Sequence, residues 1–122
     1  MCAPRVFRAG NGCCWCTHRP RCMDHPISPY AATKKACELL GMGNAAFRRV
    51  PVKDDFSVDV DAMAAMIRAD REAGHRPICV MGTAGTVQTG ATDDLVALAD
   101  LAQREKLWYH VDGAFGAMAR LS

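Results

Sequence analysis

Residues 107–116 read LWYHVDGAFG, in which Leu107–Val111 is a short apolar run that ends directly at Asp112. A run of this length and composition predicts a buried strand of a parallel sheet. Ligands of open α/β sheets bind beyond the carboxyl ends of the strands. Asp112, with the small residues Gly113 and Ala114 beside it, is therefore a candidate ligand contact, although a carboxylate here can also simply cap the turn.

Helix and strand patterns alternate along the chain before this run. The expected helices are Tyr30–Leu40, a segment from a cap at Asp59 or Asp61 to about Glu72, and a segment capped by Thr92 that ends before Lys106; the expected strands are Phe47–Val52 and Pro77–Met81. This alternation predicts βαβ units with right-handed crossovers, and so an α/β fold with a parallel sheet.

Composition excludes several classes of protein. The chain has 122 residues, of which 50% are hydrophobic and 23% charged, as expected for one globular domain. No apolar run approaches the roughly 20 residues of a membrane span. The net charge is +2, and no aromatic residues are interleaved with the basic ones. We therefore expect neither a membrane nor a nucleic-acid partner.

The first 22 residues differ from the remainder of the chain. Residues 1–22 hold four arginines, no carboxylate and five of the seven cysteines, without a helix or strand period. We expect them to be an irregular leader outside the fold, with the domain covering residues 23–122. An out-of-frame or misassigned start is the preferred interpretation, and a disordered tail and a zinc site stay open. The zinc signal is weak, because Cys13 and Cys16 form one CxxC without a second pair, and we expect no metal site.

The remaining cysteines, Cys37 and Cys79, lie in apolar helix and strand patterns. They are expected to be buried thiols, which favours a reducing, cytoplasmic setting.

A loop rich in glycine and threonine, Gly82–Gly90, follows the expected strand Pro77–Met81. It matches neither GxGxxG nor a P-loop, and such a loop is often only a turn. It nevertheless follows one strand as Asp112 follows the next. We therefore expect both at one edge of the sheet, where two candidate contacts favour a ligand.

Three motifs carry a resemblance to a known family. They are Ala84-Gly85-Thr86, Gly90-Ala91-x-Asp93-Asp94-Leu95 and Trp108-x-His110-Val111-Asp112-x-Ala114-x-Gly116. Over Ile27–Ser122 the chain resembles the pyridoxal-phosphate-dependent group II amino-acid decarboxylases, which include the aromatic-amino-acid and glutamate decarboxylases. The resemblance implies a three-layer, parallel-sheet fragment of a fold-type I large domain.

The resemblance also implies roles for individual residues around pyridoxal 5′-phosphate. Asp112 matches the aspartate that pairs with the pyridine nitrogen, Ala114 the small residue against the ring, and Thr86 the loop threonine near the cofactor. His110 belongs to the same motif as a cofactor-binding candidate. Tyr30 falls where the family has a histidine stacked on the ring.

The activity implied is that of a carboxy-lyase acting on an amino acid, in a parent enzyme that is a homodimer. The family's Schiff-base lysine lies beyond the His-Val-Asp strand, whereas Lys34, Lys35, Lys53 and Lys106 all precede it. We therefore expect this chain alone to be inactive. Another lyase, aldolase or aminotransferase on the same fold, and an inactive truncated remnant, stay as alternatives.

Overall fold

The computed structural model describes residues 12–17, 29–43, 46–87 and 89–121. The strands in these residues are β1 (Gly12–Thr17), β2 (Phe47–Val50), β3 (Arg76–Thr83) and β4 (Trp108–Asp112). The helices are α1 (Pro29–Leu39), α2 (Val60–Glu72), α3 (Leu95–Glu105) and the 3-10 helix η3 (Ala117–Leu121). The strands form one sheet in the order β2-β1-β3-β4, and every neighbouring pair is parallel.

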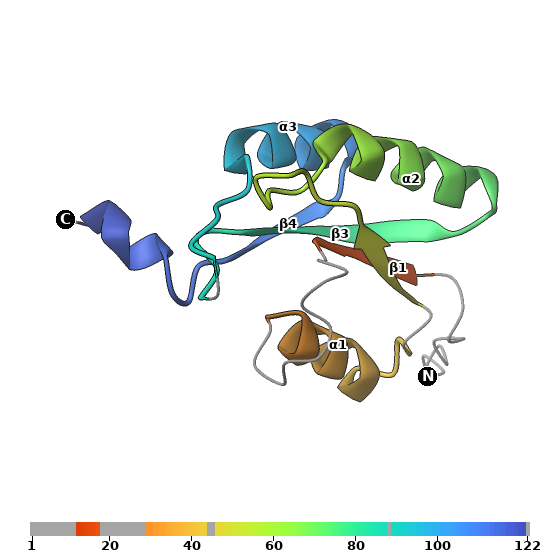
Figure 1. The fold of residues 1–122 in the computed structure, drawn as a ribbon. Helices are drawn as coiled ribbons and strands as arrows, with labels where there is room; N and C mark the ends of the chain where they lie inside the picture. Colours follow the sequence, from red (N-terminus) through yellow and green to blue (C-terminus); the bar gives the residue numbers. More distant parts are fainter. Residues whose placement is uncertain (1–11, 18–28, 44–45, 88, 122) are drawn as a thin grey trace.

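The sheet lies between two layers of helix. Figure 1 shows α2 and α3 on one face, α1 on the opposite face, and η3 beyond the end of the sheet. The path from β1 through α1 to β2 runs one way across the sheet, and the path through α2 and α3 to β4 runs the other way. Crossovers of one hand therefore place α1 opposite the other two helices. The predicted three-layer α/β fold with a parallel sheet is confirmed.

Each face of the sheet buries its own apolar cluster. Under α2 and α3, seven side chains are at most 1% exposed: Val50, Val58, Met63, Ile67, Val80, Leu98 and Leu101. On the opposite face Cys37 of α1 packs with Phe47 and Met81. The Thr33 hydroxyl also lies 3.5 Å from the Met81 sulfur, which places α1 over β3.

The prediction that residues 1–22 contain no strand is wrong for Gly12–Thr17. This segment is β1, and it lies between β2 and β3, with Cys14 in register with both Phe47 and Cys79. A strand with a parallel neighbour on each side reads as a continuous apolar run without alternation, and cysteine is itself a small apolar residue. The run CCWC meets that description. His18 and Cys22 lie outside the described residues, and the domain boundary at residues 22 and 23 stays a prediction.

Two helix starts test the capping predictions. Asp59 caps α2, since its carboxylate accepts the Ala62 N–H at 2.9 Å. Thr92 was the wrong cap for α3, which begins at Leu95 behind Asp94. The Asp94 carboxylate accepts the Ala97 N–H at 2.9 Å and so satisfies an otherwise unpaired donor of the first turn.

The strand bounds also differ from the expected ones. β3 begins one residue earlier than expected and continues for two residues after Met81, to Thr83. β2 ends at Val50, and Val52 instead forms an isolated bridge with Val58.

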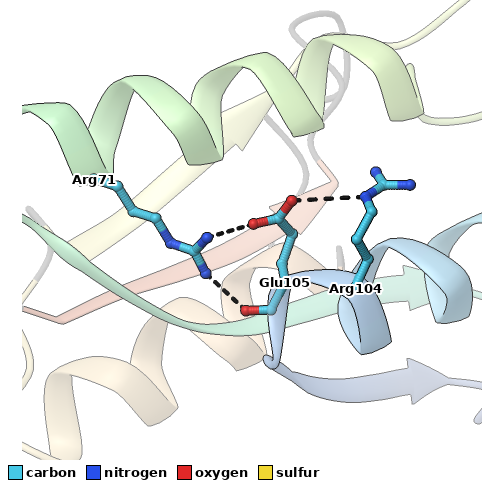
Figure 2. A network of polar contacts seen from close by, with 3 residues as sticks. All are labelled: Arg71, Arg104 and Glu105. Carbon is cyan, nitrogen blue, oxygen red and sulfur yellow. Dashed lines mark hydrogen bonds and ion pairs between the residues drawn. The ribbon is translucent and has the colours of Figure 1, made fainter.

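Helices α2 and α3 are joined at their carboxyl ends by a polar network (Figure 2). Arg71 contacts the Glu105 carboxylate at 2.5 Å and donates to the Glu105 carbonyl at 2.7 Å. Arg104 lies 3.7 Å from the other carboxylate oxygen. Because both arginines are exposed, the network contributes at most about 1 kcal/mol per pair.

Tyr109 gives the fold a testable dependence on pH. Its hydroxyl donates to the Leu95 carbonyl at 3.0 Å. Burial raises the pKa of the Tyr109 phenol above its usual 10.0, and the negative charges of Asp93 and Asp94 add to this. The folded chain therefore keeps the phenolic proton to higher pH than the unfolded chain, so the stabilisation is complete below about pH 10 and is lost above it.

We predict that the free energy of unfolding falls more steeply above about pH 10 in the wild type than in Tyr109→Phe. Denaturant unfolding of both proteins across this range measures the two free energies of unfolding. Because both proteins have the same lysines, the lysine titration cancels when the two free energies are subtracted. Equal slopes would contradict the prediction.

Candidate functional site

The carboxyl ends of β3 and β4 lie side by side. Thr83, the last residue of β3, is in register with Asp112, the last residue of β4. One residue further on, the Ala84 N–H donates to the Asp112 carbonyl at 2.8 Å. The prediction that the glycine-threonine loop and Asp112 share one edge of the sheet is confirmed.

Asp112 is half-buried at this edge and lies on the α1 side of the sheet. His110 is two residues earlier and so shares its face, and the register partner of His110 is Met81, which packs against α1. Oxygen Oδ1 of Asp112 accepts the Ala114 N–H at 3.3 Å. This bond sets the carboxylate at the start of the loop that leaves β4, as the capping alternative requires, and it occupies one oxygen.

The loop after β3 is closed on itself around Thr86. The Thr86 N–H donates to the Ala91 carbonyl at 3.0 Å, and the Gly90 N–H donates to the Thr86 carbonyl at 2.7 Å. The Thr86 and Thr89 hydroxyls lie 2.6 Å apart. These bonds hold the half-buried Thr86 hydroxyl in a defined place beyond β3.

The loops after β3 and β4 touch through two glycines. A Cβ on Gly116 would clash with the Ala84 carbonyl oxygen, and it would lie 2.6 Å from the Gly85 Cα. Gly85 has a φ of +73°, and a Cβ there would lie 2.8 Å from the Gly116 Cα. The motif glycines are thus explained by a backbone contact that no side chain fits.

The other candidates lie in different surroundings. His110 and Ala114 are exposed, on β4 and just after it. Tyr30 lies in the first turn of α1, and its side chain is outside the part of the chain that the structure describes. The structure therefore brings together Asp112, Ala114 and the Thr86 loop, and leaves Tyr30 as a prediction.

Sequence reasoning missed the role of Asp93, because a helix capped by Thr92 would have Asp93 in its first turn. Its side chain is 7% exposed and accepts the N–H groups of Val58 and Thr83, both at 2.8 Å. The available signal was the pair Asp93-Asp94 ahead of a helix. Only one of two adjacent carboxylates can cap the helix, and in the structure the other, Asp93, turns toward the core.

The chemistry at this edge is that of one carboxylate, one hydroxyl and several small residues. No three His, Cys, Asp or Glu residues gather as a metal site within the described ranges. A half-buried carboxylate is the group that favours a protonated nitrogen, because it supplies both charge and a strong acceptor. Asp112 with Ala114 beside it thus fits the pyridine ring of pyridoxal phosphate.

The comparison with protein families then decides the family. The model described as "Pyridoxal-dependent decarboxylase conserved domain" matches residues 27–122. The chain belongs to this family. Pyridoxal phosphate is therefore the family's cofactor, as the resemblance implied.

Relatives agree with this membership of the pyridoxal-dependent decarboxylases. The chain is 39% identical over 88 residues to an aromatic-L-amino-acid decarboxylase of Bacillus atrophaeus. The aligned segment covers 72% of this chain and 18% of that protein. It matches the crystal structure of mouse CSAD in apo form with a TM-score of 0.83 and 29% identity, over 98% of this chain and 23% of that one. The Oryza sativa TDC structure with PLP matches with a TM-score of 0.70 and 28% identity, over 84% and 20%.

The chain spans about a fifth of the length of these pyridoxal-dependent decarboxylases. It corresponds to a part of these longer relatives, and its fold is that of the matching part. No helix among the described residues has the length and apolar character needed to cross a membrane.

The glycine contact yields a prediction for Gly116→Ala. The added Cβ has to push apart the two loops, so the free energy of unfolding should fall by about 1–3 kcal/mol. Chemical denaturation measures the change. Ala119→Ser adds one atom at an exposed position three residues away and serves as the control. Equal stability of Gly116→Ala and the wild type would show that the two loops do not touch.

Proposed function

We propose that this chain forms one wall of the cofactor site of a pyridoxal-phosphate-dependent amino-acid decarboxylase. The observation that supports this most is the half-buried Asp112 carboxylate at the joint edge of β3 and β4. The whole protein's reaction would be the release of carbon dioxide from an amino acid. The family membership supports this reaction class, and the chain's own residues support the part that it plays.

Asp112 would hold a proton on the pyridine nitrogen. When bound, the cofactor supplies a protonated ring that accepts the electron pair left as carbon dioxide departs. A carboxylate beside the nitrogen keeps that proton in place through a charge-assisted hydrogen bond. The Ala114 N–H, 3.3 Å from Oδ1, orients the carboxylate for this task.

Neighbouring residues would shape and orient the pocket. Ala114 leaves space for the flat ring, and Thr86 presents a hydroxyl fixed by Thr89. His110 lies on the same face of β4 as Asp112 and is open to a ligand. Tyr30, at the first turn of α1, would stack on the ring in place of the family's histidine.

We also propose that this chain does not hold the cofactor covalently. All four lysines precede β4 in sequence. Lys106 lies at the amino end of β4, and the six residues from there to Asp112 span about 20 Å in an extended strand. Lys34 and Lys35 lie in α1 and Lys53 follows β2, whereas the resemblance places the family's Schiff-base lysine after the His-Val-Asp strand. The lysine for covalent attachment would then come from outside this segment, and the chain alone would be inactive.

The setting we propose is a cytoplasmic homodimer of the parent enzyme, with no nucleic-acid partner. The thiols of Cys37 and Cys79, one buried and one half-buried, support a reducing compartment. Cross-linking and sedimentation of the longer protein test the dimer.

The first test compares pyridoxal phosphate binding to the wild type and to Asp112→Asn. A hydrogen bond to a charged group contributes about 1.5–3 kcal/mol, so the variant should bind about tenfold more weakly or worse. Asp100→Asn, which removes an exposed carboxylate from α3, is the matched control and should bind as the wild type does. Absorbance titration at equilibrium gives the dissociation constants.

Borohydride reduction of the same mixtures tests the covalent part of the proposal. We expect no saturable labelling of any one lysine, as mapped by mass spectrometry. Equal binding by the wild type and Asp112→Asn would contradict the role of Asp112, and specific labelling of one lysine would contradict the non-covalent role.

The reaction itself is tested on the longer protein that carries this segment. Release of carbon dioxide from an amino acid supports decarboxylation. Transfer of the amino group or cleavage of a carbon–carbon bond without carbon dioxide would assign the site to an aminotransferase or an aldolase. Failure to bind pyridoxal phosphate would identify an inactive remnant.

A further inference from the structure

The side chain of Asp93 joins two segments of backbone that are separate in sequence. It is 7% exposed, and a buried carboxylate is costly unless hydrogen bonds replace its water. Oxygen Oδ1 accepts the Val58 N–H, and Oδ2 accepts the Thr83 N–H, both at 2.8 Å. The two oxygens therefore connect the segment ahead of α2 with the end of β3.

Asp93 holds Thr83 by both of its backbone polar groups. While the Thr83 N–H donates to the Asp93 carboxylate, the Asp93 N–H donates to the Thr83 carbonyl at 2.9 Å. The register of β3 with β1 ends at Met81, two residues earlier. Asp93 thus provides the backbone of Thr83 with the kind of hydrogen bonds that β1 provides to β3 as far as Met81.

Thr83 in turn lies next to Asp112 on the neighbouring strand β4. The two residues are in register, and the adjacent Ala84 N–H donates to the Asp112 carbonyl at 2.8 Å. Asp93 and Asp112 are therefore connected through the end of β3: Asp93 is hydrogen-bonded to Thr83, and the next residue, Ala84, is hydrogen-bonded to the backbone of Asp112. A shift of Thr83 would move the backbone that carries the Asp112 side chain.

The far end of this path is anchored in the core. Val58 is 1% exposed and packs among the buried residues under α2 and α3. Functional groups hold their geometry best when their supports are themselves fixed by packing. Asp93 therefore connects a rigid part of the fold to the edge that carries the candidate site.

We propose that Asp93 is a positioning residue, whose carboxylate fixes the end of β3 and through it the place of Asp112 at the cofactor site. This rests on the proposed function as far as the cofactor is concerned. The link from Asp93 to Asp112 is a property of the protein alone and is tested without a ligand.

The variant Asp93→Asn keeps the shape of the side chain but sets an amide NH₂ against one of the two N–H donors. Asp94→Asn is the matched control, since Asp94 is the next residue, is exposed and caps α3. Circular dichroism establishes that both variants fold. Amide hydrogen exchange, followed by NMR in the full 122-residue chain, compares Ala84 at the strand end with Val80 in the middle of β3.

In Asp93→Asn we expect exchange at Ala84 to accelerate about tenfold relative to Val80, because a buried hydrogen bond to a charged group is lost. In Asp94→Asn the ratio should stay as in the wild type. An unchanged ratio in Asp93→Asn overturns the proposal, and so does an equal acceleration at both amides, since Asp93 would then only stabilise the fold.

A measurement on the wild type covers the case in which Asp93→Asn does not fold. Scalar couplings across hydrogen bonds should join the Thr83 amide to the Asp93 carboxyl carbon, and the Ala84 amide to the Asp112 carbonyl carbon. Their presence supports the path, and the absence of either coupling overturns it.

A second experiment tests the effect of Asp93 on the cofactor site. It uses pyridoxamine 5′-phosphate labelled with ¹⁵N in the ring, because this compound binds without forming a bond to a lysine. We expect the pKa of the bound ring nitrogen to fall in Asp93→Asn and to stay at the wild-type value in Asp94→Asn. If exchange responds but the nitrogen does not, Asp93 fixes the strand end without positioning the site, and the proposal fails while the proposed function stands. If the wild type itself does not bind the compound, the proposed function fails, and hydrogen exchange still decides the link.

Discussion

Parallel pairing of β3 with β4 is the constraint on which the candidate site depends. Because the two strands run the same way and in register, Thr83 and Asp112 come to the same edge. The loops that follow meet there through Gly85 and Gly116, where the backbones leave no space for a Cβ. The pairing thereby brings together the Thr86 loop with Asp112 and Ala114, which lie almost thirty residues further along the chain.

The layers on either side of the sheet keep this edge in place. Leu98 and Leu101 of α3 are buried in the cluster on one face of the sheet, and the Tyr109 hydroxyl donates to the carbonyl of Leu95, the first residue of that helix. On the other face, α1 lies over Met81. Asp93 adds hydrogen bonds from its carboxylate to the Val58 and Thr83 N–H groups, so packing and buried hydrogen bonds both support the end of β3.

The sequence predicts the elements with strong periodicity and the edge that they create. The Asp59 cap identifies a helix start by purely local chemistry, and the run from Leu107 to Val111 identifies a strand. The prediction that this strand is buried is wrong, because β4 is the last strand of the described sheet and Trp108, His110 and Val111 are exposed. β1 was missed because its four central residues, CCWC, carry no alternation and follow a leader rich in arginine. Its place depends on pairing with Phe47 and Cys79, which lie 33 and 65 residues after Cys14 and which no local pattern records.

Asp93 was misplaced for a related reason. Its neighbour Asp94 satisfies the capping rule, and nothing in the local sequence distinguishes the residue that caps from the residue that turns inward. The distinction comes from Val58 and Thr83, whose N–H groups need a partner in the folded chain. Burial and long-range hydrogen bonds therefore decide the part of the site that sequence periodicity leaves open.

The central claim is that the joint edge of β3 and β4 receives the ring of the cofactor. The most direct measurement is an NMR titration of the ¹⁵N-labelled chain with pyridoxamine 5′-phosphate. We predict saturable shifts at the amides of Ala84, Thr86 and Ala114, with Arg76 and Trp108 at the opposite edge unchanged. Saturable shifts centred on Arg76 and Trp108, or none at any amide, would contradict the claim.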